Sequence, residues 1–264
     1  MLLIFAGPTL AADLILTSPP RETAEAGQKL YGPLAEYISG LIGTKVVYQH
    51  PRNWLTYQRD MRDNKYDIIF DGPHFISWRI VHLKHDVLVK LPGQLEFLLV
   101  AKADDQSINS LDDLIGQRIC AISPPNLSSL TILDRFRNPV RQPVMTGIQG
   151  GMAKVHKMFV DGKCKAAVLR IDFFKKKLQQ AERDKLKILF HSAPVPNQGI
   201  SVSQRLSASA KNKILQSLTF GDGAKISRAI VKRFAGKQVK GFVPAKNDEY
   251  AGNNMFLEGI IFGW

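Results

Sequence analysis

The sequence has no long hydrophobic run and no repeat, and it contains only two cysteines. Its longest apolar stretch, residues 1–12, is shorter than the roughly 20 residues that a membrane-spanning helix needs. The 20 glycines and 14 prolines are scattered without a period, which excludes collagen-like chains and tandem-repeat arrays. With 45% hydrophobic and 22% charged residues among 264, the chain is instead typical of a globular protein with a substantial core.

The sequence also lacks the common catalytic signatures. It has no G-x-S-x-G elbow, no H-E-x-x-H pair and no P-loop, and the glycines of residues 147–151 lack the dinucleotide-binding spacing. His82, His85 and Asp86 form a trio that suits a metal, but a solvated surface is the preferred interpretation. We therefore expect no enzymatic activity, no metal and no cofactor. An enzyme acting on a small phosphorylated or heterocyclic compound is the weaker alternative.

Acidic residues are scarce relative to basic ones. The chain has 36 Lys and Arg against 23 Asp and Glu, a formal charge of +13. This charge favours an anionic partner, which is a small oxyanion, a nucleic acid or a membrane surface. The basic run Lys175–Lys177 has no interleaved aromatic residues for stacking on bases. We therefore expect no nucleic-acid binding.

The first twelve residues suit the apolar part of a secretory signal. Small residues at Thr9, Ala11 and Ala12 offer a cleavage site before the polar Asp13, but no basic residue precedes the stretch. We interpret residues 1–12 as a truncated signal segment of an exported protein. The alternative is a buried first strand.

The two cysteines lie in separate strand-like runs. Cys120 and Cys164 are far apart in sequence and form no C-x-x-C motif, so they give no zinc signature. An even number of cysteines in an exported chain favours one disulfide, here joining neighbouring strands of one lobe. The alternative is two buried free thiols.

Strand-like and helical patterns alternate along the first third of the chain. The runs 13–17, 45–49 and 66–70 read as strands. Between the first two, apolar residues at helical spacing predict a helix over 30–41 that ends at Gly43, and Pro51 is expected to open a second helix. This order predicts an α/β fold with a parallel sheet covered by helices.

The pattern repeats in the middle of the chain. Strands are expected at 117–122, 164–169 and 187–190, and helices at 126–136, 152–160 and 173–183. Segments 96–102 and 200–203 are candidate crossover strands between lobes. We therefore predict an α/β fold of two lobes joined by two crossover strands, with a central cleft: residues 13–101 plus 200–264 form lobe 1, and residues 102–199 form lobe 2.

Candidate ligand contacts in lobe 1 follow the predicted strands. In open α/β sheets, ligands bind beyond the carboxyl ends of the strands. Asp71 could accept a hydrogen bond from a protonated ligand oxygen or pair with an amine, or it could simply form a turn with Gly72. His74 could donate to an oxyanion or be structural, and Trp54 could wall a pocket or lie in the core.

In lobe 2, a hydroxyl-rich helix start follows the strand 117–122. Asn126 is a plausible N-cap, and Ser128, Ser129 and Thr131 surround the first turn. A helix N-terminus binds oxyanions, although these hydroxyls could also serve only as caps. Arg170, just past a strand, is a candidate bidentate contact to an oxyanion, with a surface arginine as the alternative.

Four segments together resemble a known family. They are Ser18-Pro-Pro-Arg21, Tyr31-Gly-Pro-Leu-Ala-Glu-Tyr37, Tyr66-Asp-Ile-Ile-Phe-Asp-Gly-Pro73 and Pro194-Val-Pro-Asn197. They resemble the phosphate/phosphite/phosphonate-binding (PhnD-like) periplasmic proteins of ABC importers, over residues 13–203. The resemblance implies the two-lobed type II periplasmic-binding-protein fold. The family's hydroxyl turn falls on residues 127–129, with departures at Leu127 and Leu130. A family aromatic residue falls on Asp71, which replaces a pocket wall with a charge, and another falls on Trp54, which remains aromatic.

The resemblance implies how the protein works. Two lobes close on a small anionic solute, a phosphate-, phosphite- or phosphonate-type oxyanion, and deliver it to a permease with an ATPase subunit. Closure is then a population shift toward a state with contacts from both lobes. The resemblance implies a periplasmic protein, soluble or membrane-associated, and we expect a monomer. The alternative is a ligand-sensing module of the same fold that feeds a membrane receptor or kinase.

Overall fold

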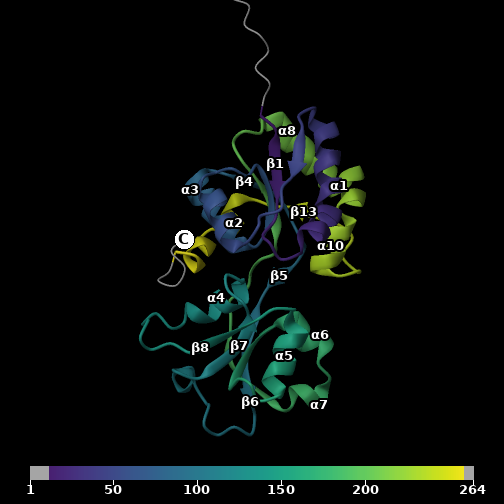
Figure 1. Cartoon of the computed structure of the whole chain (residues 1–264). Helices are drawn as coiled ribbons and strands as arrows, with labels where there is room; N and C mark the ends of the chain where they lie inside the picture. Colours follow the sequence, from purple (N-terminus) through teal and green to yellow (C-terminus); the bar gives the residue numbers. More distant parts are fainter. Residues whose placement is uncertain (1–11, 259–264) are drawn as a thin grey trace, which may run out of the picture. The chain divides into compact units, whose positions relative to one another are not determined.

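The computed structural model describes residues 12–258, which form two compact units (Figure 1). Unit 1 contains residues 12–71, 84–91 and 199–245, and unit 2 contains residues 72–83, 92–198 and 246–258. The predicted signal segment lies outside the described residues except for Ala12. Within the described range, no helix is both long and apolar enough to span a membrane.

Unit 1 is built on a six-stranded mixed sheet. The strand order is β13-β4-β12-β3-β1-β2, in which β1 is parallel to β2 and β3, while β12 is antiparallel to β3 and β4. The elements are β1 (Leu14–Thr17), α1 (Ala24–Ile42), β2 (Val46–Tyr48), α2 (Trp54–Arg62), β3 (Ile68–Asp71), β4 (Asp86–Lys90), β12 (Gly199–Val202), α8 (Ala208–Phe220), α9 (Asp222–Ile226), α10 (Arg228–Ala235) and β13 (Val243–Pro244).

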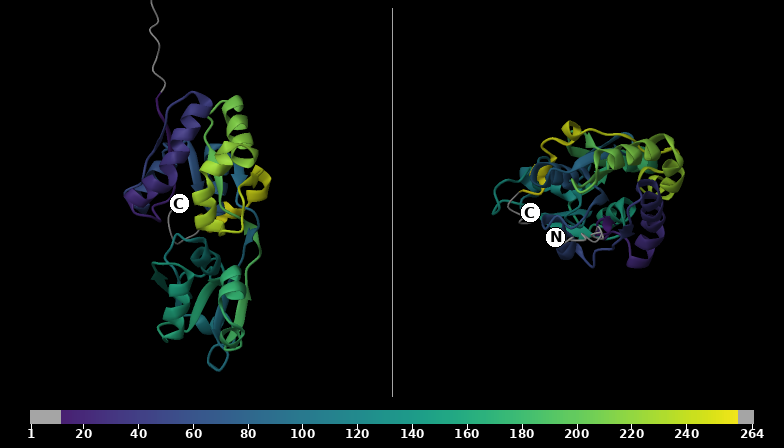
Figure 2. Two further views of the ribbon diagram at one scale, coloured as in Figure 1. Left: turned by 90° about the vertical axis from the view of Figure 1, so that its right-hand side faces the viewer. Right: turned by 90° about the horizontal axis from the view of Figure 1, so that it is seen from above.

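Helices α1, α8 and α10 cover one face of this sheet. Alternate strand residues such as Leu16, Phe70 and Ile200 form one core cluster with Ile38 of α1 and Ile230 of α10. Figure 2 shows α1, in purple, beside the green helices α8 to α10. This packing fixes the start of α1 at the edge where the parallel strands end.

Unit 2 is built on a five-stranded sheet in the order β10-β6-β9-β7-β8. Strand β7 is parallel to β8 and β9, and β6 is antiparallel to β9 and β10. The elements are α3 (Pro73–Leu83), β5 (Gln94–Leu95), β6 (Phe97–Lys102), η1 (Asp112–Leu114), β7 (Arg118–Ile122), α4 (Leu127–Leu133), β8 (Val144–Ile148), α5 (Met152–Val160), β9 (Ala166–Arg170), α6 (Ile171–Lys177), α7 (Gln180–Arg183), β10 (Leu186–His191), β11 (Val195–Pro196), η2 (Asn247–Tyr250) and η3 (Asn253–Phe256). Strands β5 and β11 pair separately.

Both faces of the unit 2 sheet are buried. Along β6, Leu99 joins the core beneath α4, whereas Leu98 and Val100 join the core beneath α5 and α6. Figure 1 shows α5, α6 and α7 together on one side of this sheet and α4 near its other side. A sheet covered on both faces leaves its strand ends as the places where polar side chains can gather.

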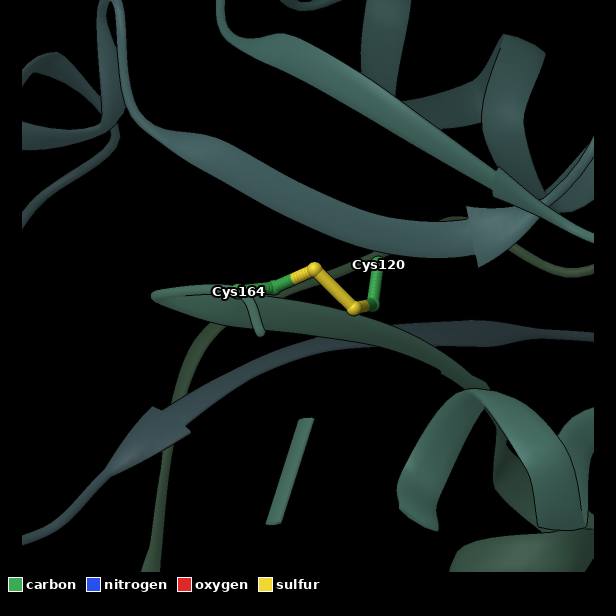
Figure 3. Close-up of a disulfide and its surroundings, with 2 residues drawn as sticks. All are labelled: Cys120 and Cys164. Atoms are coloured by element: carbon green, nitrogen blue, oxygen red, sulfur yellow. A yellow bond between two sulfur atoms is a disulfide. The ribbon is translucent and has the colours of Figure 1, made fainter. Parts of the chain in front are cut away.

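The predicted disulfide is confirmed. Cys120 of β7 and Cys164, just before β9, are bonded, and their strands are neighbours in the unit 2 sheet (Figure 3). The bond therefore joins two adjacent strands of one lobe, as the cysteine count indicated.

Two predicted helices have different bounds in the structure. Pro51 does not open α2: the helix begins at Trp54, because the Asn53 side chain caps it by accepting the Thr56 N–H at 2.8 Å. The helix expected over 173–183 is two helices, α6 and α7, because Leu178 leaves helical geometry with ψ 135° and is buried.

The division into units also differs from the predicted lobes in three segments. Residues 92–101, expected in lobe 1, group with unit 2, where β6 lies within the five-stranded sheet. Helix α3 and residues 246–258 group with unit 2 rather than with residues 13–71. They pack on each other: Ser77 Oγ donates to Asn254 Oδ1 at 3.2 Å, and Phe256 packs against the unit 2 core. These long-range contacts, rather than any feature of local sequence, decide the grouping.

Candidate ligand-binding site

In unit 1, the three parallel strands end at one edge of the sheet. Ser18 follows β1, Tyr48 is the last residue of β2, and Asp71 is the last residue of β3. The loop after β1 continues through Arg21 and Glu22 into α1, whose N-cap is Thr23. Because carboxyl ends of parallel strands are where ligands bind in open α/β sheets, this edge is the candidate site of unit 1.

An aromatic group lies at this edge beside α1. The rings of Tyr31 and Tyr48 stack with centroids 5.4 Å apart, and the ring of Phe70 lies 6.2 Å from that of Tyr31 and 5.0 Å from that of Phe234. The guanidinium of Arg21 lies over the Phe234 ring, 5.6 Å from its centroid. The arginine is therefore held against aromatic surface by a cation–π contact.

Three polar side chains in this group have buried atoms with no hydrogen-bond partner among the described residues. They are Nη1 of Arg21, both carboxylate oxygens of Glu22 and the hydroxyl of Tyr31. Buried polar atoms are hydrogen-bonded in the great majority of cases, because desolvation without a partner is costly. Such a concentration of unsatisfied atoms at a strand edge is typical of a surface that a polar ligand completes.

Burial and neighbouring charges shift the pKa values of several groups at this edge. Burial raises the pKa of the Tyr31 hydroxyl, the charge of Glu22 raises it further, and the charge of Arg21 opposes both. Burial lowers the pKa of His50, with Glu22 acting in the opposite direction. The Tyr48 hydroxyl and His50 Nδ1 are 3.1 Å apart. Glu22 thus influences several groups of the edge at once.

Trp54 and Asp71, which the sequence singled out, are brought together through Tyr57. The Tyr57 hydroxyl donates to Asp71 Oδ2 at 2.5 Å, and the Trp54 ring packs edge-on against the Tyr57 ring at 6.0 Å. Asp71 is fully buried. Since neighbouring strand residues face opposite sides, Asp71 and Phe70 point to different faces of the sheet. The structure therefore separates this trio from the Tyr31 side of the edge.

In unit 2, the parallel strands β7, β8 and β9 likewise end at one edge. Ser123 follows β7, and Arg170 is the last residue of β9. His74, at the start of α3, reaches the loop before α4: its Nε2 donates to the carbonyl of Pro125 at 3.1 Å. His74 is buried, so this bond fixes both its proton position and the loop.

The predicted hydroxyl turn at α4 is engaged within the protein. The Ser128 hydroxyl donates to Asn126 Oδ1 at 2.8 Å, the Ser129 hydroxyl donates to the carbonyl of Ile122, and the Thr131 hydroxyl donates to the carbonyl of Leu127 at 2.8 Å. Asn126 is the N-cap, as predicted, and also accepts the Ser128 N–H. A hydroxyl has one hydrogen to donate, so these three side chains offer a ligand only acceptor oxygens in this arrangement.

Arg170 is the side chain at this edge with an unused donor. Its side chain is 24% exposed, its Nη2 lies 3.4 Å from Asp172 Oδ2, and its Nε is buried with no hydrogen-bond partner among residues 12–258. Burial lowers the pKa of Arg170, an effect that Asp172 partly opposes. An arginine remains protonated despite such a shift, so Arg170 presents a partly desolvated cation.

Sequence analysis identified Arg170 as a candidate but did not single out Arg21, Glu22, Tyr31 or Tyr48 as site residues. A signal for two of them was present: Arg21 lies in the loop after the first strand, and Tyr31 begins a motif of the resemblance. Glu22 had no such signal, because an acidic residue just before a helix normally reads as a surface residue. Its ion-pair partner, Arg233 of α10, lies far along the chain.

Comparisons with known proteins agree with this arrangement. Residues 16–250 match the family model described as "ABC transporter, phosphonate, periplasmic substrate-binding protein". A search of curated proteins finds no match.

Several solved structures share the fold. XAC2383 from Xanthomonas citri, bound to ATP, is 14% identical, with a TM-score of 0.69 over 95% of this chain and 100% of that one. PhnD1 from Prochlorococcus marinus, in complex with methylphosphonate, is 13% identical, with a TM-score of 0.64 over 93% and 97%. A binding protein component of an ABC phosphonate transporter from Pseudomonas aeruginosa (PA3383) is 15% identical, with a TM-score of 0.60 over 92% and 85%.

At these identities the structures show a common fold, that of type II periplasmic binding proteins. The family match, which covers most of the chain, shows more. This protein therefore belongs to the phosphonate-binding family of periplasmic substrate-binding proteins of ABC transporters.

Proposed function

We propose that this protein binds a small phosphorus oxyanion, a phosphate, phosphite or phosphonate, and delivers it to a permease with an ATPase subunit. One observation carries the proposal: in each unit an arginine near the carboxyl end of a parallel strand has a buried nitrogen without a hydrogen-bond partner among the described residues, Nη1 of Arg21 and Nε of Arg170. Arginine is the side chain best suited to phosphate-like oxygens, because its donors are fixed in a planar fork and its charge is permanent.

Two further features support the proposal, one concerning the compartment and the other the ligand. The disulfide between Cys120 and Cys164 suits an exported protein. The relatives with ATP and methylphosphonate bound carry phosphorus oxyanions in both cases. In this proposal the protein is a carrier rather than an enzyme, lies in the periplasm and acts as a monomer.

In this proposal, the other site residues predicted from the sequence would support the two arginines. Trp54 and Asp71 would line the unit 1 edge from the side of α2, where Tyr57 orients the Asp71 carboxylate. In unit 2, His74 would hold the loop that positions Ser128 beside Asn126. Together with Ser129 and Thr131, these groups would shape the strand-end edge of their own unit, where Arg21 or Arg170 supplies the donors.

Replacing Arg170 tests the proposal. In Arg170→Gln we expect the affinity for the bound oxyanion to fall about tenfold to a hundredfold, because a charge-assisted hydrogen bond contributes about 1.5–3 kcal/mol. Titration calorimetry with phosphate, phosphite and methylphosphonate measures the change. Arg118→Gln is the matched control, because Arg118 is an exposed arginine at the opposite end of neighbouring β7. Equal affinities of Arg170→Gln and the wild type would contradict the proposal.

A further inference from the structure

The C-terminal helices of unit 1 carry an unbalanced positive charge. Residues 223–245 contain six Lys and Arg residues and no Asp or Glu. Lys225 Nζ lies 2.8 Å from Asp222 Oδ1. Arg233 Nη2 lies 3.6 Å from Glu22 Oε1. The other four basic residues are exposed and form no ion pair within the described range. They are Arg228, Lys232, Lys237 and Lys240, which we call the basic face.

Arg228 links α10 to the loop that follows it, residues 236–241. Its Nη1 donates to the carbonyl of Lys240 at 2.6 Å, and its Nη2 donates to the carbonyl of Lys237 at 3.3 Å. These bonds use donors of the guanidinium and leave its positive charge in place. Lys232 lies one turn further along the same side of α10, since residues four apart are neighbours on a helix surface. The basic face is therefore a single surface of helix and loop.

Apolar side chains are exposed beside the basic face. Phe220, the last residue of α8, is 81% exposed, and Ile226 of α9 is 39% exposed. Helix α9 adjoins the loop of the basic face, because Ala224 Cβ lies 4.0 Å from the position that a Cβ on Gly241 would occupy. Gly241 directly follows Lys240. Cationic and apolar side chains thus meet on the surface of α9, α10 and the loop.

The corner between α8 and α9 is closely packed. Ser217 Oγ lies 2.5 Å from the Tyr37 hydroxyl of α1 and accepts the Gly223 N–H at 3.2 Å. A Cβ on Gly223 would lie only 2.7 Å from Ser217 Oγ, so a larger residue would not fit there. This packing fixes the path of the chain just after Phe220. The exposure of Phe220 is therefore a property of the folded corner.

An anionic lipid surface matches this combination of side chains. Helix α10 is amphipathic, with Ile230 and Val231 buried in the core of unit 1 and the basic face exposed. Clusters of about four to eight Lys and Arg residues on an amphipathic helix are typical of binding to anionic phospholipids. A phenylalanine beside them can enter the boundary between headgroups and acyl chains. Lysine is depleted at protein–protein interfaces, and a small ligand needs a concave site.

We propose that the basic face, together with Phe220 and Ile226, docks this protein on a bilayer that contains anionic phospholipid. Adsorption is reversible, because each lysine near such a surface raises the affinity only about fivefold and salt screens the attraction. This inference goes beyond the proposed oxyanion binding and uses none of the residues assigned to it. Docking would keep the carrier close to the permease that the proposed function requires.

Flotation with lipid vesicles tests this proposal. Vesicles of phosphatidylcholine alone are compared with vesicles that also contain phosphatidylglycerol. We expect the wild type to float only with the anionic vesicles and to be released by salt. The double variant Lys237→Gln and Lys240→Gln should bind them about tenfold to thirtyfold more weakly. The double variant Lys175→Gln and Lys177→Gln is the control, because it removes the same charge from exposed positions of α6 and should bind almost as the wild type does.

A second variant tests the apolar part of the surface. Phe220→Ser should bind anionic vesicles severalfold more weakly, because it removes the aromatic ring that enters the bilayer. Leu55→Ser is the matched control, since Leu55 of α2 is 76% exposed and lies outside the docking surface. Equal losses in Phe220→Ser and Leu55→Ser would contradict the contact of Phe220 with lipid.

Two results would overturn the docking surface. One is failure of the wild type to bind anionic vesicles, which would leave a protein partner as the reason for the basic face. The other is an equal loss of binding in the two lysine double variants, which would show that net charge alone attracts the protein to lipid. Neither result bears on oxyanion binding, which titration calorimetry measures without vesicles.

Discussion

At the scale of single residues, the candidate site contains buried charged side chains, and the described residues provide hydrogen-bond partners for only some of their polar atoms. Arg170 has one nitrogen near Asp172, and Glu22 has an arginine nearby. Within residues 12–258, however, Arg170 Nε has no acceptor and the Glu22 carboxylate has no hydrogen-bond donor. Asp60 shows the contrasting case of a buried carboxylate that the protein compensates fully. Its Oδ1 accepts from Lys65 Nζ at 2.9 Å and from Arg59 Nη2 at 2.9 Å, and its Oδ2 accepts from the Tyr66 hydroxyl at 3.4 Å.

Asp60 gives a prediction for stability against pH. Burial alone would raise the pKa of its carboxyl, but the hydrogen bonds and charges of Lys65 and Arg59 outweigh burial and lower the pKa below its ordinary 3.8. A depressed carboxyl pKa contributes stability above the unfolded value, and this contribution is lost as the pH falls through the folded value. We therefore expect the free energy of unfolding to drop below about pH 4.

Urea denaturation between pH 5 and pH 2 measures this contribution. Asp60→Asn should be less stable at pH 5, by about 1–3 kcal/mol, and should lose less stability than the wild type on acidification. Asp63→Asn is the control, because the Asp63 side chain is 52% exposed and its replacement should change the profile little. Parallel profiles for the wild type and Asp60→Asn would contradict the role assigned to Asp60.

At the scale of elements, the hydrophobic periodicity of the sequence predicts amphipathic helices well and uniformly buried helices poorly. The helix at 152–160 has the predicted bounds, and Gly43, at φ 70°, ends α1 as expected. Helix α3 gave no periodic signal, because its first seven residues are all buried and polar residues do not mark a solvent face. Strand β8 was missed because it is an edge strand that contains a glycine and only one buried residue, Ile148.

The disulfide is an element-scale device whose removal has a predictable cost. It closes a loop over a sequence separation of 44 between β7 and the start of β9. A loop of that length is worth about 3–4 kcal/mol through the entropy of the unfolded chain. We expect the double variant Cys120→Ser and Cys164→Ser to lose about that much stability in chemical denaturation. It should still bind its ligand, because the bond lies away from the carboxyl ends of the strands, where the candidate site is.

Reduction of the wild type is the matching control for this variant. Denaturation in the presence of a thiol reductant should lower the free energy of unfolding as much as the double substitution does. A variant as stable as the oxidised wild type would show that the two strands hold together without the covalent link.

At the scale of the whole molecule, the sequence predicted the fold class and the family but only part of the site. The charge of +13 favoured an anionic partner, and strand order placed the candidate site beyond the carboxyl ends of the strands. Arg170 was identified because it ends a strand. Glu22 was not, because its ion-pair partner, Arg233 of α10, lies more than 200 residues further along the chain. The grouping of residues 246–258 with unit 2 likewise depends on tertiary packing.

The central claim is that this protein binds a phosphorus oxyanion, and thermal unfolding with a ligand panel tests it most directly. The panel contains phosphate, phosphite, methylphosphonate, 2-aminoethylphosphonate and ATP, with sulfate as the non-phosphorus control. A ligand at about 100 times its Kd stabilises the folded state by about 2.7 kcal/mol, which raises the unfolding midpoint of a chain of this size by several degrees. We predict such a rise for at least one phosphorus compound and a smaller one for sulfate. An unchanged midpoint with every phosphorus compound would contradict the account.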